Sequence, residues 1–321
     1  MAGVTILSDL LVDQVAYNLA ADFSLRPELY FDGVADVKPT AQAHPGSSVK
    51  FEIFTDLAVA STALNESTDL TAESMADSQV TVTLAEYGNA VKTSAKVRGT
   101  SYIVPFDPIV ANLIGFNAGV SIDTLARDVL KAGDNVRYAT GGTSNPTSRL
   151  TVEADDTLVA FDVRRTLADL RGANVPTISN GYYHAYIHPD VSFDLRGETG
   201  AAAWRDPHTY SQPGEIWNGE VGAFEGFRFI ESPRAPVFAD AGSSTTLTDV
   251  YATLFLGRQS LAKAYSYTDG NGAMPRIIPG PVTDTLRRFV PLGWYWFGGY
   301  SVYRQACLRR VESASSIGTN A

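Results

Sequence analysis

The fold is decided by an aromatic stretch near the end of the chain, Gly293-Trp-Tyr-Trp-Phe-Gly-Gly-Tyr-Ser-Val-Tyr303. Side chains alternate between the two faces of an extended strand, so Trp294 and Trp296 share one face while Tyr295 and Phe297 share the other. Because both faces carry large aromatic rings, we expect both to be covered. The two tryptophans are the predicted core of this segment.

Upstream, the sequence predicts an acidic two-stranded arm from Ser47 to Leu84. Val49, Phe51 and Ile53 alternate with polar residues, and a partner strand follows at 80–84. The connection between the strands, 65–77, is polar and acidic. A lone hairpin is at best marginally stable in water, so this arm suits a subunit that is completed by its neighbours.

The remaining elements indicate an α+β fold. A spine-like helix is predicted at Val120–Lys131, with Ser121 as its N-cap and Gly133 as its stop. Further helices are expected at residues 4–20, 157–171 and 259–265, and further strands at 182–189, 215–231 and 250–256.

Composition excludes several classes of protein. The 321 residues are 45% hydrophobic, enough for a substantial core, and the net charge is −10, from 25 basic against 35 acidic side chains. Such a balance argues against a strong grip on nucleic-acid phosphates. The N-terminus lacks the basic region of a signal peptide, and no apolar run approaches the length of a membrane helix, so no membrane contact and a cytoplasmic origin are expected. Cys307 is expected to be a buried, inert thiol.

Two histidines could suggest a metal site. His184 and His188 would share one face of a helix, but they fall in a predicted strand. Four residues of strand separate their Cβ atoms by about 13 Å, too far for one zinc ion. We expect two histidines of an aromatic strand, and neither a metal ion nor a cofactor.

Other patterns are weak as signs of catalysis. Ser260 and Lys263 match the Ser-x-x-Lys pattern of penicillin-recognising enzymes without its companion motifs, and an exposed helix face is the preferred interpretation. Glycosidase sites use paired carboxylates, but the four glutamates here fall in a glycine-rich hairpin and are expected to be solvated: Glu215, Glu220, Glu225 and Glu231. Asp269-Gly-Asn-Gly272 lacks the later ligands of a calcium loop. The sequence predicts no catalytic residue.

Four segments, in their order and spacing, resemble the major capsid proteins of tailed bacteriophages, which share the HK-ninety-seven fold, and more narrowly their N-four-type branch. They are Thr83-Leu-Ala-Glu-Tyr-Gly88, Tyr186-Ile-His-Pro189, Gly219-Glu-Val-Gly-Ala-Phe-Glu-Gly-Phe-Arg-Phe-Ile-Glu231 and Gly293-Trp-Tyr-Trp296. The resemblance implies an N-terminal arm (1–43), an extended E-loop (44–88), a peripheral domain (89–150 and 280–321) and an axial domain (151–279).

The resemblance also implies a function and its partners. Copies would form pentamers and hexamers of an icosahedral head around double-stranded DNA, located in the virion and assembled in the host cytoplasm. The partners would be the chain itself, a scaffolding protein, a portal and a decoration protein, with only non-specific contact to DNA. The alternatives are an intracellular hydrolase that uses Ser260 and Lys263, and a tail or decoration protein.

Charge predicts one assembly contact. The arm is acidic and the segment 286–312 is basic, and the resemblance places the E-loop over a neighbour's peripheral domain. We expect these two surfaces to dock, through Glu66, Asp69, Glu73 and Asp77 on one side and Arg287, Arg288, Arg309 and Arg310 on the other.

Overall fold

The computed structural model describes residues 31–40, 48–54, 57, 59–61, 63, 66–67, 69, 72–100, 106–198, 220–243, 247–266, 274–279, 284–286 and 288–317. The helix predicted within residues 4–20 lies outside these ranges. Glu215, the Asp269–Gly272 segment and Arg287 lie outside them as well.

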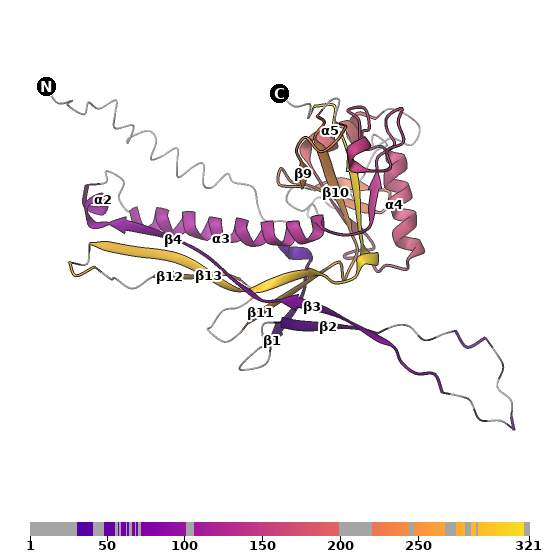
Figure 1. Ribbon diagram of the computed structural model, residues 1–321, viewed down its shortest axis with the longest axis horizontal. Helices are drawn as coiled ribbons and strands as arrows, with labels where there is room; N and C mark the ends of the chain where they lie inside the picture. The colour runs from indigo at the N-terminus through magenta and orange to yellow at the C-terminus, as the bar shows by residue number, and fades with distance from the viewer. Residues whose placement is uncertain are drawn as a thin grey trace.

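A long sheet is built around β13 (Phe289–Val302), the strand that contains the aromatic stretch (Figure 1). One edge of β13 pairs with β4 (Ala85–Ser94) over ten residue pairs. The remaining strands continue the sheet from the other side of β13: β12 (Arg276–Pro279), β11 (Leu261–Ser266), and β1 (Asp36–Thr40) parallel to β11. The helix α3 (Phe106–Lys131) runs along one face of this sheet.

The tryptophans of β13 lie between the sheet and α3. Trp294 is 5% exposed and Trp296 is fully buried, and both pack in one cluster with Ile114 and Ile122 of the helix. The indole Nε1 of Trp294 donates a hydrogen bond of 2.9 Å to Oδ1 of Asn117. This face of β13 is therefore a continuous apolar core.

α3 is longer than the sequence predicted, since it begins at Phe106 rather than at Val120. The buried stripe of the later turns extends back into the first half of the helix, where Val110, Ile114 and Ala118 are buried at a spacing of four residues. Ser121 is not an N-cap, because it lies inside the helix and its hydroxyl donates to the carbonyl of Asn117 at 2.7 Å. The prediction started too late because Gly115 and Gly119 interrupt the apolar pattern.

The second sheet has seven strands and carries two helices on one face. Its order is β5 (Val136–Tyr138), β14 (Leu308–Ser313), β10 (Val250–Leu256), β6 (Tyr183–Ile187), β8 (Phe227–Glu231) and β7 (Glu220–Phe224), with β9 (Val237–Phe238) also paired to β10. The helices are α4 (Ala160–Gly172) and α5 (Pro189–Gly197). Phe227, Phe229 and Phe255 form the centre of the core beneath them.

Several short elements complete the described chain. The hairpin consists of β2 (Ser48–Phe54) and β3 (Asp77–Thr83), paired antiparallel over seven residue pairs. α2 (Ala95–Thr100) follows β4, and single 3-10 turns occur at η2 (Asp32–Val34), η3 (Arg149–Thr151) and η5 (Gln305–Cys307). No helix in the described ranges is long and apolar enough to cross a membrane.

Most predicted strands are confirmed, and one predicted helix is wrong. Residues 182–189 and 250–256 contain β6 and β10, and within 215–231 the described part forms β7 and β8 around a glycine turn. The segment 259–265 is not helical: residues 259 and 260 belong to a turn, and β11 begins at Leu261. All six side chains of this strand are buried, so no polar face reveals the two-residue period of a strand.

Strand pairing also crosses the expected domain boundaries. β5 and β14, which fall in the ranges assigned to the peripheral domain, belong to the seven-stranded sheet. β11 and β12, which fall in the range assigned to the axial domain, belong to the long sheet.

Replacing Trp296 with alanine tests the tryptophan core. The variant should lose about 3 to 5 kcal/mol of unfolding free energy, because a fully buried aromatic ring leaves a cavity under α3. Urea denaturation of the free subunit measures this loss. Leu150→Ala, at a side chain that is 73% exposed, is the matched control and should change the free energy by less than about 0.5 kcal/mol. Equal effects of the two changes would contradict the assignment.

Candidate assembly surfaces

The root of the hairpin is held on the face of the long sheet that points away from α3. Phe51 and Val82 pack against Ala262 and Ala264 of β11, and the rings of Phe51 and Tyr303 lie 5.3 Å apart. Gly299 makes this contact possible: a Cβ atom on it would lie 2.0 Å from the carbonyl oxygen of Thr83. The hairpin is thus fixed at its root.

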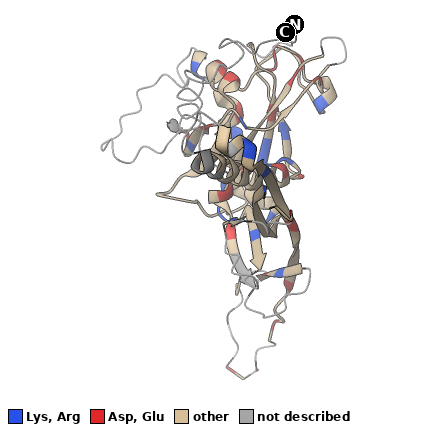
Figure 2. Cartoon of the chain, turned by 90° about the vertical axis from the view of Figure 1, so that its left-hand side faces the viewer, with Lys and Arg blue, Asp and Glu red and all other residues tan. Residues whose placement is uncertain are grey.

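Beyond its root the hairpin extends away from both sheets (Figure 1). Its apolar side chains there are exposed, from Phe54 (56%) to Val59 (89%). All four of the acidic residues predicted to dock are exposed: Glu66, Asp69, Glu73 and Asp77. Figure 2 shows acidic positions in red on the projecting segment. An exposed surface of this mixed kind is typical of a contact with another molecule.

The same face of the long sheet carries a shallow groove beyond the hairpin root. Gly88, Ala90 and Gly293 form its floor, where the absence of large side chains leaves the backbone open. Ile278, Pro291 and Tyr295 form its apolar sides. Ile278 is 38% exposed, and Pro291 and Tyr295 are half-buried, so the apolar lining is partly open to solvent.

Basic side chains accompany this groove. Lys92 and Arg276 are exposed and fall on the same face, because Lys92 pairs with Pro291 and Arg276 pairs with Tyr295. Arg288 immediately precedes β13, is exposed, and forms an ion pair of 2.9 Å with Asp284. The far end of the long sheet therefore combines an apolar groove with positive charge.

The structure does not bring together the arginines predicted as one basic surface. Arg309 and Arg310 lie on β14 in the second sheet, at the other end of the fourteen-residue strand from Arg288. Arg310 is buried, pairs with Glu312 at 2.9 Å and donates to the carbonyl of Lys131. Burial disfavours the charged form of the Arg310 guanidinium and lowers its pKa. Formal charge alone does not distinguish this buried pair, in which Glu312 is 0% exposed, from solvated surface charges.

The two histidines have separate surroundings. His184 is buried on β6, with Nε2 3.1 Å from the hydroxyl of Ser179. His188 caps α5, because its Nδ1 accepts from the backbone N–H of Asp190 at 3.3 Å, and burial lowers its pKa. Among the described residues, no group of three metal-ligating side chains is present.

Ser260 and Lys263 do not form a serine–lysine pair, and the exposed helix face expected for them is wrong. Both are buried, and residues three apart along an extended segment point to opposite faces. Lys263 instead places its Nζ 2.7 and 2.9 Å from the two carboxylate oxygens of Asp32. The carboxylates of the glycine-rich hairpin are also separate: Glu225 lies at the β7–β8 turn and Glu231 pairs with Arg196 at 3.6 Å. Cys307 is buried, and burial raises the pKa of its thiol.

The chain has a long sheet backed by one helix, a second sheet with its own core, and a projecting hairpin with exposed apolar side chains. These features are those of a structural subunit that other molecules complete. Comparison with known families identifies which one: residues 7–317 match the model of the family described as phage capsid protein. The chain belongs to this family. It is a major capsid protein that forms the head shell, as the resemblance had implied.

Solved structures confirm the HK-ninety-seven-like fold. The capsid protein of Ralstonia phage GP4 is 16% identical, with a TM-score of 0.74 over 90% of this chain and 92% of that chain. The capsid protein of cyanophage Pam1 is 15% identical, with a TM-score of 0.62 over 87% and 88%. A chain of Mycobacterium phage Che8 is 17% identical, with a TM-score of 0.57 over 89% and 92%. No curated protein matches the chain.

Gly299→Ala tests the attachment of the hairpin. The added methyl group would collide with the carbonyl of Thr83, so the root of the hairpin must move. We expect a large loss of shell yield and only a small fall in the melting temperature of the free subunit. Electron microscopy and thermal melting measure the two effects. Gly172→Ala is the control, because nothing lies within 4 Å of the added atom, and it should assemble normally. Normal shell yield from Gly299→Ala would show that the contact is not needed.

Proposed function

We propose that the chain assembles as pentamers and hexamers of an icosahedral head around double-stranded DNA, and that the hairpin of each copy lies in the groove of its neighbour's long sheet. One observation carries the docking: the hairpin exposes apolar and acidic side chains, while the groove exposes apolar walls beside basic ones. Self-assembly into a shell follows from the family, so a second copy is the natural occupant.

The contact has an apolar part and an electrostatic part. Burial of apolar surface contributes about 25 cal/mol per Å² removed from water. Exposed ion pairs contribute only about 0.2 to 1 kcal/mol each, and Arg288 must also exchange its partner Asp284 for a carboxylate of the neighbour. The apolar groove therefore supplies most of the affinity, and the charges select the register and the orientation of the hairpin.

The assignment of regions and further partners follows the family resemblance. Parts of the N-terminal arm (1–43) and of the E-loop (44–88) reach neighbours, while Phe31, β1 and the start of β4 stay in their own subunit. The long and seven-stranded sheets form the bodies of the peripheral and axial domains. A scaffolding protein, a portal and a decoration protein are the proposed partners, and assembly takes place in the host cytoplasm. The net charge of −10 supports only non-specific contact with packaged DNA, because an acidic wall would not retain phosphates.

Charge reversal tests the docking. Arg276→Glu combined with Arg288→Glu should lower shell yield at low salt, since like charges would then face the acidic hairpin. Added salt should raise the yield of this variant, because screening now weakens a repulsion, whereas it should lower the yield of the wild type. Adding Asp69→Lys and Glu73→Lys should restore part of the yield by returning opposite charges to the contact. Shell yield is measured by sedimentation at several ionic strengths, because screening acts over about 10 Å at 0.1 M salt.

Arg309→Glu is the matched control, because this arginine lies on β14 in the second sheet. It should leave the yield and its salt dependence unchanged. The docking proposal fails if the paired reversal leaves yield unchanged, or if the compensating lysines bring no recovery.

A further inference from the structure

The two sheets meet at an apolar joint that contains Phe31. This side chain is fully buried, and its ring lies 4.9 Å from the ring of Tyr186 on β6. The surrounding cluster draws on both sheets and on α3: Leu261, Tyr300 and Val302 from the long sheet, Tyr186, Ile230, Leu254, Leu256 and Leu308 from the seven-stranded sheet and its border, and Ala126, Val129 and Leu130 from the helix. Phe31 thus contacts the place where one body of the subunit joins the other.

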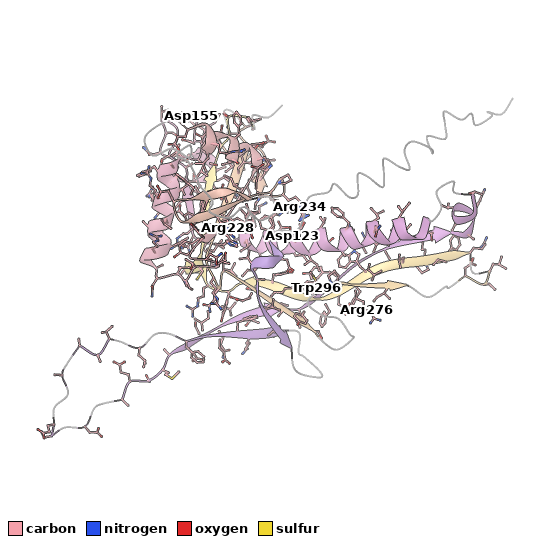
Figure 3. All side chains as sticks on the ribbon, turned by 180° about the vertical axis from the view of Figure 1, so that it is seen from behind. Asp123, Asp155, Arg228, Arg234, Arg276 and Trp296 are labelled. Carbon is pink, nitrogen blue, oxygen red and sulfur yellow. The ribbon has the colours of Figure 1, made fainter. Side chains whose placement is uncertain are left out.

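A buried carboxylate on α3 holds this point. Asp123 is 0% exposed, and its Oδ1 accepts from the backbone N–H groups of Phe31 at 2.6 Å and of Asp32 at 3.1 Å. Its Oδ2 accepts from the guanidinium of Arg234, which follows β8 of the seven-stranded sheet (Figure 3). One carboxylate therefore connects the helix of the long sheet, the 31–32 segment and the second sheet.

Asp32 extends the network into the long sheet. Its carboxylate accepts from Nζ of Lys263 on β11, which is 2% exposed, and from the hydroxyl of Tyr300 on β13. Burial, followed by the charge of Asp32, raises the pKa of Tyr300, so this hydroxyl remains a hydrogen-bond donor. The joint network consists of Asp32, Asp123, Arg234, Lys263 and Tyr300.

Such a network has more effect on geometry than on stability. Apolar contacts are not directional, so the cluster around Phe31 alone would tolerate small rotations of one sheet against the other. Hydrogen bonds between charged groups are directional and short. Desolvation offsets much of the attraction within a buried ion pair, and replacing the whole pair with neutral groups is often nearly neutral for stability.

We propose that the joint network sets the angle between the two sheets, and that this angle determines the curvature of the head shell. In a closed assembly of identical subunits, the relation between neighbours repeats at every contact, so a small change within each copy accumulates around the shell. Asp32 and Lys263 are then positioning residues for shell size. This inference depends on the shell-forming function and is independent of where the hairpin docks.

The test replaces both partners of the central ion pair. Asp32→Asn with Lys263→Met removes both charges, keeps similar volumes and leaves an acceptor for Tyr300. The free subunit should melt close to the wild-type temperature, because no uncompensated charge remains. Shells of the variant should lose their single diameter and show a mixture of sizes in electron micrographs.

A second ion pair, away from the joint, provides the control. Arg137 on β5 pairs with Asp169 on α4, and both side chains are partly buried. Arg137→Met with Asp169→Asn removes both charges of this pair and should leave the diameter unchanged in the shells that form. The proposal is overturned if the joint variant keeps the wild-type diameter, or if this control pair broadens the distribution equally.

A conservative variant covers the case in which the double variant does not fold. Asp32→Glu keeps the charge but moves the carboxylate by one methylene group, so re-forming the pair with Lys263 displaces the 31–32 segment that Asp123 holds at the joint. It should fold and give shells of altered or mixed diameter. Folded Asp32→Glu protein with wild-type shells would overturn the proposal. Since diameter is measured only on shells that have formed, the result does not depend on the hairpin contact.

Discussion

The structure depends on the burial of one face of β13 beneath a single helix. Trp294 and Trp296 on that face are buried, so α3 must lie along the strand to cover them. At the rise of an α-helix, the 26 residues of α3 span about 39 Å. A subunit with one helix on one side of a long sheet is necessarily elongated. Among the described residues, the opposite face of the sheet is covered at the hairpin root, where Phe297 packs, and the groove beyond it is open. This open part is the face on which we place the hairpin of a neighbouring copy.

The strand content of the fold was largely predictable, because alternation and β-branched or aromatic residues have local causes. The arm strands around Phe51 and Val82 follow the two-residue period, and β6 and β10 are short apolar runs bounded by turns. Prediction failed where burial removes the pattern: β11 is covered on both faces, and the first half of α3 contains glycines that a single-sequence reading treats as breaks. Tertiary packing decides such cases, and local sequence carries little sign of it.

The candidate surfaces were predictable only in part, for an electrostatic reason. Sequence reports formal charge, and on that measure Arg288 and Arg310 are equivalent. The fold makes Arg288 an exposed cation at the far end of the long sheet and Arg310 a buried partner of Glu312. The same limit applies to Lys263: four residues suggested a weak catalytic pattern, whereas a contact 231 positions away along the chain, to Asp32, defines its role. Long-range pairing of this kind leaves no trace in spacing.

A shell must form without trapping wrongly joined subunits, and this requirement explains the division between strong and weak contacts in the chain. Interactions within one copy, such as the tryptophan core and the buried carboxylate of Asp123, are directional or fully desolvated, and they fix the shape of each subunit before assembly. The surfaces left for neighbours are shallow, partly polar and screened by salt, so each contact alone is reversible. Errors can therefore dissociate, while the sum over many correct contacts holds the closed shell. On our proposal, the joint network within each copy sets the curvature of the shell. The contacts between copies can therefore remain individually weak.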